Sequence, residues 1–128
     1  MPLDLKINIL VVDDFATMRR TVKNVLVHMG FASIDEAADG GAAFQMMQHK
    51  TYGLVISDWN MQPVSGIELV MSVRADGALA ATPFIMVSSE SAPDNLALAR
   101  SAGVSDYVVK PFTADTLKQK IIGVLTAV

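Results

Sequence analysis

The sequence predicts an α/β fold in which a parallel β-sheet carries helices on both faces, as a three-layer sandwich. Short, nearly continuous apolar runs alternate with segments whose apolar residues recur at helical spacing, and this alternation makes five strand–helix units. Several of the apolar runs stop abruptly at a polar residue. Strands buried on both faces have such continuous runs, and strand–helix alternation implies a parallel sheet with right-handed crossovers.

The first unit has the clearest pattern. Residues 7–12 form a β-branched and apolar run that ends at Asp13 and Asp14. In residues 16–29 the apolar side chains recur every three or four positions, and Gly30 then offers a C-terminal stop. We therefore expect a buried strand followed by an amphipathic helix.

The same alternation continues to the end of the chain. The pattern is weakest in the second strand and strongest in the third, which ends at Asp58. The fourth strand ends at Ser88 and the fifth at Lys110, and Pro93 suits the first turn of the fourth helix. The remaining strands are expected at residues 33–37, 54–57, 83–87 and 107–109. The helices that follow them are expected at residues 41–48, 67–74, 94–102 and 114–125.

Length and composition narrow the class of protein. The 128 residues, 52% of them hydrophobic, suit one domain over residues 1–128 with a packed core and no effector domain. A net charge of −3 with scattered basic residues argues against nucleic-acid binding, and the absence of cysteine excludes disulfides and thiolate sites. Neither a signal peptide nor a membrane span is evident, so we expect a cytoplasmic monomer. Six methionines are expected to fill the core: Met18, Met29, Met46, Met47, Met71 and Met86.

The polar residues at the strand ends predict a functional site. Parallel strands present their carboxyl ends at one edge of the sheet, where such folds bind ligands. Asp13, Asp14 and Asp58 would repel one another there unless a cation neutralised them, and hard oxygen ligands suit Mg²⁺, Mn²⁺ or Ca²⁺. Taken singly, each aspartate is more often explained by a helix cap or a turn. Together they favour a metal site.

The same edge suits phosphoryl chemistry. Mg²⁺ commonly binds one or two carboxylates together with a phosphate, and a carboxylate can itself be the nucleophile. Charge on the phosphoryl oxygens then needs an ammonium and a hydroxyl donor, which Lys110 and Ser88 offer. Alone, Ser88 is more often a cap or turn residue, and Lys110 is most often a solvated surface lysine.

Three stretches of the chain, residues 10–15, 55–61 and 107–113, resemble the response-regulator receiver domains of bacterial two-component systems, and in particular the chemotaxis type. The resemblance covers nearly the whole chain. It implies a flavodoxin-like (βα)5 fold with strand order 2-1-3-4-5. It also implies that Asp58 is the phosphoacceptor.

The resemblance implies roles for the neighbouring residues too. Asp14, Asp58 and the backbone carbonyl of Asn60 would hold Mg²⁺, and Asp13 would act through a water. Lys110 would contact the phosphoryl oxygens, and Ser88 would move toward them. The switch residue would be Tyr107, whose ring rotates inward. Asn60 and Glu90 would tune dephosphorylation.

Three features depart from the receiver pattern. Residues 62–66 read Gln-Pro-Val-Ser-Gly where most receivers have a proline directly after Met61, so we expect a differently shaped loop beside the site. Ser88 replaces the commoner threonine but keeps the hydroxyl donor. Residues 91–94 lack the lysines of the best-known chemotaxis relatives, which leaves the partner of that face open.

The function expected is that of a single-domain response regulator rather than an enzyme. A sensor histidine kinase would phosphorylate it, and it would then change its affinity for a downstream protein such as a flagellar motor switch protein, with a possible phosphatase partner. Its only reactions would be self-phosphorylation from phosphodonors and autodephosphorylation. Two alternatives stay open: a phosphate sink that does not act on the motor, and an interaction module that needs no phosphate. A Mg²⁺-dependent phosphohydrolase is disfavoured because the chain has no cap domain.

Overall fold

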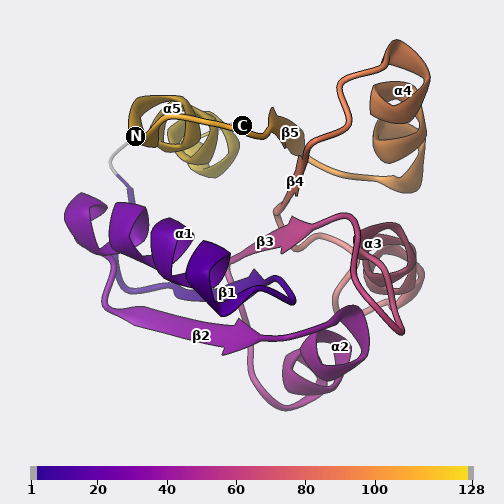
Figure 1. Cartoon of the computed structure of the whole chain (residues 1–128). Helices are drawn as coiled ribbons and strands as arrows, with labels where there is room; N and C mark the ends of the chain where they lie inside the picture. Colours follow the sequence, from indigo (N-terminus) through magenta and orange to yellow (C-terminus); the bar gives the residue numbers. More distant parts are fainter. Residues whose placement is uncertain (1–2, 127–128) are drawn as a thin grey trace.

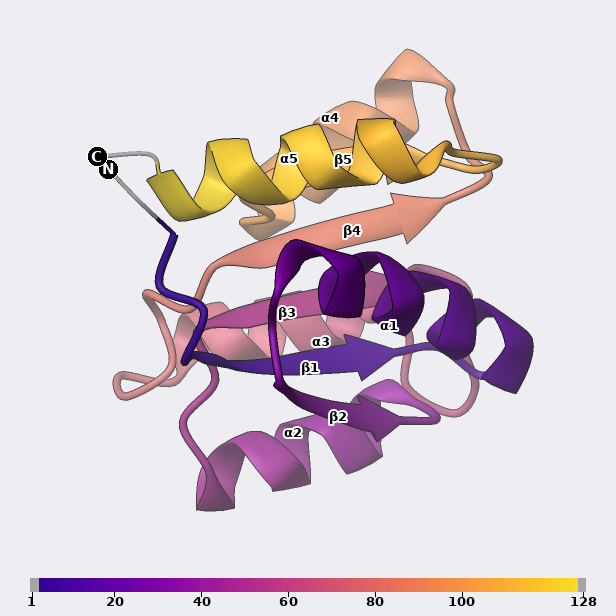
Figure 2. The ribbon, with the colours of Figure 1, turned by 90° about the vertical axis from the view of Figure 1, so that its left-hand side faces the viewer.

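A computed structural model of the protein describes residues 3–126. Within them, the chain forms a parallel five-stranded sheet in the order β2-β1-β3-β4-β5, which confirms the predicted architecture and strand order. The strands are β1 (Asn8–Val12), β2 (Ser33–Ala37), β3 (Leu54–Asp58), β4 (Phe84–Ser88) and β5 (Asp106–Val109). All strands run in one direction, so their carboxyl ends share one edge (Figure 2). The weak second strand pairs with β1 along its whole length.

Helices cover both faces of this sheet. They are α1 (Ala16–Met29), α2 (Gly40–His49), α3 (Gly66–Ala75), α4 (Pro93–Ala102) and α5 (Ala114–Thr126). α1 and α5 lie on one face, and α2, α3 and α4 on the other (Figure 1). Among residues 3–126, no helix is both long and apolar enough to cross a membrane.

The core consists of two layers, one on each face of the sheet. In β1, Leu10 and Val12 belong to the layer under α2, α3 and α4, whereas Ile9 and Val11 belong to the layer under α1 and α5. All four side chains are almost completely buried. Burial on both faces explains why the strands are continuous apolar runs and not alternating ones.

Local signals place the helix ends. Gly30 ends α1 in a left-handed conformation, φ 103°, which glycine adopts without steric cost. Pro93 occupies the first turn of α4, as predicted. α3 begins at a capping box, in which Ser65 accepts from the Glu68 N–H and the Glu68 carboxylate accepts from the Ser65 N–H.

One core prediction is wrong. Met71 is 56% exposed, because α3 buries Leu69, Val70 and Val73, and Met71 lies about 100° around the helix from Val70. Of the other five methionines, two are buried and three are partly buried against the core: Met47 and Met86, then Met18, Met29 and Met46.

Candidate functional site

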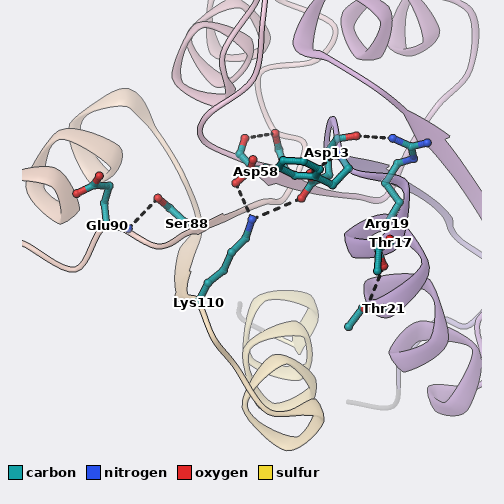
Figure 3. A network of polar contacts seen from close by, with 10 residues as sticks. Asp13, Thr17, Arg19, Thr21, Asp58, Ser88, Glu90 and Lys110 are labelled. Atoms are coloured by element: carbon teal, nitrogen blue, oxygen red, sulfur yellow. Dashed lines mark hydrogen bonds and ion pairs between the residues drawn. The ribbon is translucent and has the colours of Figure 1, made fainter.

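Polar residues from four strands meet at the carboxyl edge of the sheet (Figure 3). Asp13 follows β1, Asp58 ends β3, Ser88 ends β4 and Lys110 follows β5. In the strand order of this sheet, β3 lies between β1 and β4, so Asp58 is central. The arrangement predicted from the strand ends is therefore present.

Three carboxylates form a compact acidic cluster. One carboxylate oxygen from each of Asp13, Asp14 and Asp58 lies within 4.8 Å of the others. Asp13 and Asp58 are buried, 3% and 6% exposed, whereas Asp14 is exposed. Oxygen donors that converge in this way, with one side open to solvent, suit a hard divalent cation that keeps part of its water shell.

Burial sets the protonation behaviour of Asp13. Removal from solvent raises the pKa of its carboxyl group, and the nearby Asp58 charge acts in the same direction. The N–H of Phe15, 2.9 Å from Asp13 Oδ1, and the charge of Lys110 oppose the rise in pKa. The cluster thus holds negative charge at an electrostatic cost, which a bound cation would relieve.

Lys110 joins two members of the acidic cluster. Its Nζ lies 3.0 Å from Asp58 Oδ1 and 3.6 Å from Asp13 Oδ2. Its backbone N–H donates to the carbonyl of Ser88 at 2.8 Å, which extends the pairing of β4 and β5 as far as this residue. The sheet therefore fixes the backbone of Lys110, from which the side chain reaches Asp58.

Ser88 and Tyr107 are connected through Glu90. The Ser88 side chain is fully buried, and its Oγ accepts from the Glu90 N–H at 3.0 Å. The Tyr107 hydroxyl donates to the Glu90 carbonyl at 2.8 Å, with the ring only 6% exposed. Burial also raises the pKa of Tyr107, so the hydroxyl stays a donor at neutral pH.

The loop after Asp58 packs closely on its surroundings. Asn60 is exposed, whereas Met61 is 2% exposed and belongs to the core. The carbonyl of Val64 accepts from the N–H of Gly40 at the start of α2, at 3.1 Å. The N–H of Gly66 donates to the carbonyl of Trp59 at 2.9 Å, so the Gln62–Gly66 segment is anchored at Val64 and Gly66, whereas Gln62 and Pro63 are exposed.

Comparison with known proteins places this geometry in a family. A model of the response regulator receiver domain matches residues 9–122. The chain belongs to the receiver-domain family. It is 48% identical over 113 residues to the chemotaxis protein CheY of Pseudomonas aeruginosa, covering 88% of this chain and 91% of that protein. It is 44% identical over 119 residues to the chemotaxis protein CheY-3 of Vibrio cholerae, covering 93% and 92%.

Solved structures agree with this membership. The chemotaxis protein CheY4 of Vibrio cholerae superposes with a TM-score of 0.87 at 32% identity, covering 94% of this chain and 99% of that one. A response regulator receiver protein of Pseudomonas putida gives a TM-score of 0.82 at 29% identity, covering 91% and 95%. The flavodoxin-like fold implied by the resemblance is therefore confirmed.

Three contacts of this receiver domain were not predicted from the sequence. Arg19 donates to the backbone carbonyl of Asp13 at 2.6 Å and pairs with Glu36 at 3.0 Å, which braces the turn that carries the acidic pair. The rings of Trp59 and Tyr107 meet edge to face, with centroids 6.2 Å apart. The residue after Asp58 thereby touches the expected switch residue. A basic residue six positions beyond Asp13 and an aromatic next to Asp58 were the only sequence signals.

Proposed function

We propose that this receiver domain is a phosphorylation-dependent switch, in which Asp58 accepts a phosphoryl group from a sensor histidine kinase. The observation that carries the proposal is the contact of Lys110 with Asp58 inside the acidic cluster. A buried carboxylate that faces an ammonium and two further carboxylates suits metal-assisted phosphoryl transfer better than a structural role. Membership of the family supports the same assignment.

The positions of the side chains support the following reaction. A carboxylate oxygen of Asp58 attacks the phosphorus of a phosphoimidazole or an acyl phosphate and forms a new P–O bond. The bond from phosphorus to the leaving nitrogen or oxygen breaks, and its electron pair stays with the leaving group. Lys110 offsets charge on the phosphoryl oxygens, and the Ser88 hydroxyl donates to one of them after moving toward it. The chain acts on itself, not on a separate substrate.

The acidic cluster suits Mg²⁺, with Mn²⁺ or Ca²⁺ as substitutes. Asp14 and Asp58 would hold the cation together with the backbone carbonyl of Asn60, and Asp13 would contact it through a water. When bound, the cation supplies positive charge that offsets both the carboxylates and the phosphoryl oxygens.

The output is a change of affinity for a downstream protein. Tyr107 and Glu90 connect Ser88 to the surface formed by α4, β5 and α5, so a shift of the hydroxyl alters that surface. The similarity to chemotaxis proteins favours a flagellar motor switch protein as the target. Asn60 and Glu90, two positions beyond Asp58 and Ser88 respectively, would set the hydrolysis of the phosphoryl group, alone or with a phosphatase.

Phosphorylation is tested by incubating the protein with Mg²⁺ and acetyl phosphate and measuring intact mass and Trp59 fluorescence. We expect one added phosphoryl group and a fluorescence change, both lost in Asp58→Asn and in EDTA. Asp115→Asn, an exposed aspartate of α5, is the matched control and should behave as the wild type. Uptake by Asp58→Asn, or none by the wild type, would refute the phosphoacceptor assignment.

The partner is tested by measuring binding to a motor switch protein with and without beryllofluoride. We expect binding at least tenfold tighter with beryllofluoride, about 1.4 kcal/mol. Equal binding in both states would favour the phosphate-independent interaction module. No binding, with rapid return of the phosphoryl group to the kinase, would favour the phosphate sink.

A further inference from the structure

Glu90 is held through three of its groups. Its N–H donates to Ser88 Oγ, its carbonyl accepts from the Tyr107 hydroxyl, and its carboxylate Oε2 accepts from Asn95 Nδ2 at 3.2 Å. Ser88 belongs to β4, Tyr107 to β5 and Asn95 to the first turn of α4. One loop residue therefore links two strands of the sheet to the helix beside them.

The two ends of α4 are attached differently. At its C-terminal end, Arg74 donates to the carbonyl of Gly103 at 2.8 Å and to that of Thr82 at 2.6 Å. Ala99, which is completely buried, also lies in the second half of the helix. At the N-terminal end, residues 89–94 are exposed. The bond from Asn95 to Glu90 ties the exposed loop of residues 89–92 to the first turn of the helix.

We propose that Asn95 is a positioning residue of the switch. Its amide holds the Glu90 carboxylate, and so keeps residues 89–92 where the Glu90 carbonyl accepts from Tyr107. Asn95 thereby sets the fraction of molecules in which Tyr107 is buried, both before and after phosphorylation. The proposal rests on the proposed function, because it assigns a residue that adjusts the same switch.

The chemistry of this contact allows a sharp test. A carboxylate only accepts hydrogen bonds, so residue 95 must supply the donor. Asn95→Asp has nearly the same shape but places a second carboxylate against Glu90, which repels it. Adding Glu90→Gln to this variant gives residue 90 an amide donor, while residue 95 is now a carboxylate acceptor. The hydrogen bond can then form in the opposite direction. The double variant therefore separates this contact from any general effect of either substitution.

The experiment follows Tyr107 by fluorine NMR after 3-fluorotyrosine incorporation. The chain has two tyrosines, so the buried Tyr52 serves as an internal reference. Spectra of the wild type, Asn95→Asp and the double variant are recorded in Mg²⁺ with and without beryllofluoride. Asn24→Asp, an exposed asparagine of α1, controls for added charge. Arg74→Lys weakens the attachment of the C-terminal end of α4, and so controls for a general loosening of this helix.

We expect Asn95→Asp to move the Tyr107 signal toward that of exposed tyrosine and to lower the buried fraction about threefold, as one exposed hydrogen bond would. The double variant should restore most of the wild-type position, and the two controls should leave it unchanged. An unmoved Tyr107 signal in Asn95→Asp, or no recovery in the double variant, would overturn the proposal.

Phosphoryl uptake from acetyl phosphate is measured in parallel. If Asn95→Asp takes up the phosphoryl group normally and its Tyr107 signal is unmoved, only the role of Asn95 is refuted. If the wild type takes up no phosphoryl group, the proposed function is refuted.

Discussion

The ammonium of Lys110 lies 3.0 Å from Asp58 Oδ1, and the same group lies 3.6 Å from Asp13 Oδ2. One positive charge therefore faces two buried carboxylates, with Asp14 beside them. A single ammonium does not balance this cluster. We therefore expect the charge at this edge of the sheet to affect stability, and with it the proposed cation binding and phosphoryl transfer.

Replacing Lys110 should change cation affinity and the phosphorylation rate in opposite directions. In Lys110→Met we expect Mg²⁺ to bind several-fold more tightly, because a competing positive charge is gone. Phosphorylation by acetyl phosphate should slow at least tenfold, because charge on the phosphoryl oxygens is no longer offset. A Trp59 fluorescence titration measures the first effect, and intact mass against time measures the second. Lys118→Met on α5 is the control, and an unchanged phosphorylation rate in Lys110→Met would contradict the role of Lys110.

Removing one charge from the acidic cluster should stabilise the fold. Burial raises the pKa of Asp13, so its ionised form is held at a cost. Asp13→Asn keeps an oxygen for the Phe15 N–H, and we expect the free energy of unfolding in EDTA to rise by about 1 kcal/mol. The stabilisation that Mg²⁺ confers on the wild type should shrink in this variant. Thermal unfolding with EDTA and with Mg²⁺ gives both values, and a less stable Asp13→Asn would count against this account.

Two glycines should respond in opposite ways to the same substitution. A Cβ at Gly66 would collide with the backbone carbonyl of Asp58 and with the sulfur of Met86, whereas one at Gly123 of α5 meets nothing within 4 Å. We expect Gly66→Ala to lower the free energy of unfolding by about 3 kcal/mol and to impair phosphorylation. Gly123→Ala should raise it by about 0.5–1 kcal/mol through helix propensity. Urea denaturation of both variants measures these changes. An unchanged free energy of unfolding in Gly66→Ala would show that the groups packed around Asp58 can move aside at little cost.

An ion pair on β2 should make stability depend on pH. Asp35 accepts from Lys50 at 2.8 Å and from the Tyr52 hydroxyl at 2.6 Å, and these contacts lower its pKa below the usual value. The stabilisation is therefore present above the unfolded pKa of about 3.9 and is lost as the pH falls through the folded value. Asp35→Asn should cost about 0.5 kcal/mol at pH 7, because the pair is partly exposed, and less at pH 3, below the unfolded pKa. Urea denaturation at both pH values provides the comparison, and an equal cost at both would contradict it.

The sequence by itself determined the layered α/β fold and the location of the candidate site. Continuous apolar runs and helical spacing are local properties, because strand and helix periods depend on neighbouring residues. Even the weak run at residues 33–37 forms the expected strand. Polar residues at the strand ends then placed Asp13, Asp14, Asp58, Ser88 and Lys110 at one edge, since parallel strands end together.

Tertiary structure alone decided which of these groups touch. Lys110 and Asp58 are 52 positions apart, and Tyr107 and Glu90 are 17 apart, so their contacts depend on strand register and side-chain conformation. The bracing by Arg19 and the exposure of Met71 depend in the same way on how each helix packs against the sheet. The bond from Asn95 to Glu90 spans only five residues, yet it depends on where the β4–α4 loop folds back. Periodicity specifies the face of an element, whereas contacts between elements require the packed three-dimensional arrangement.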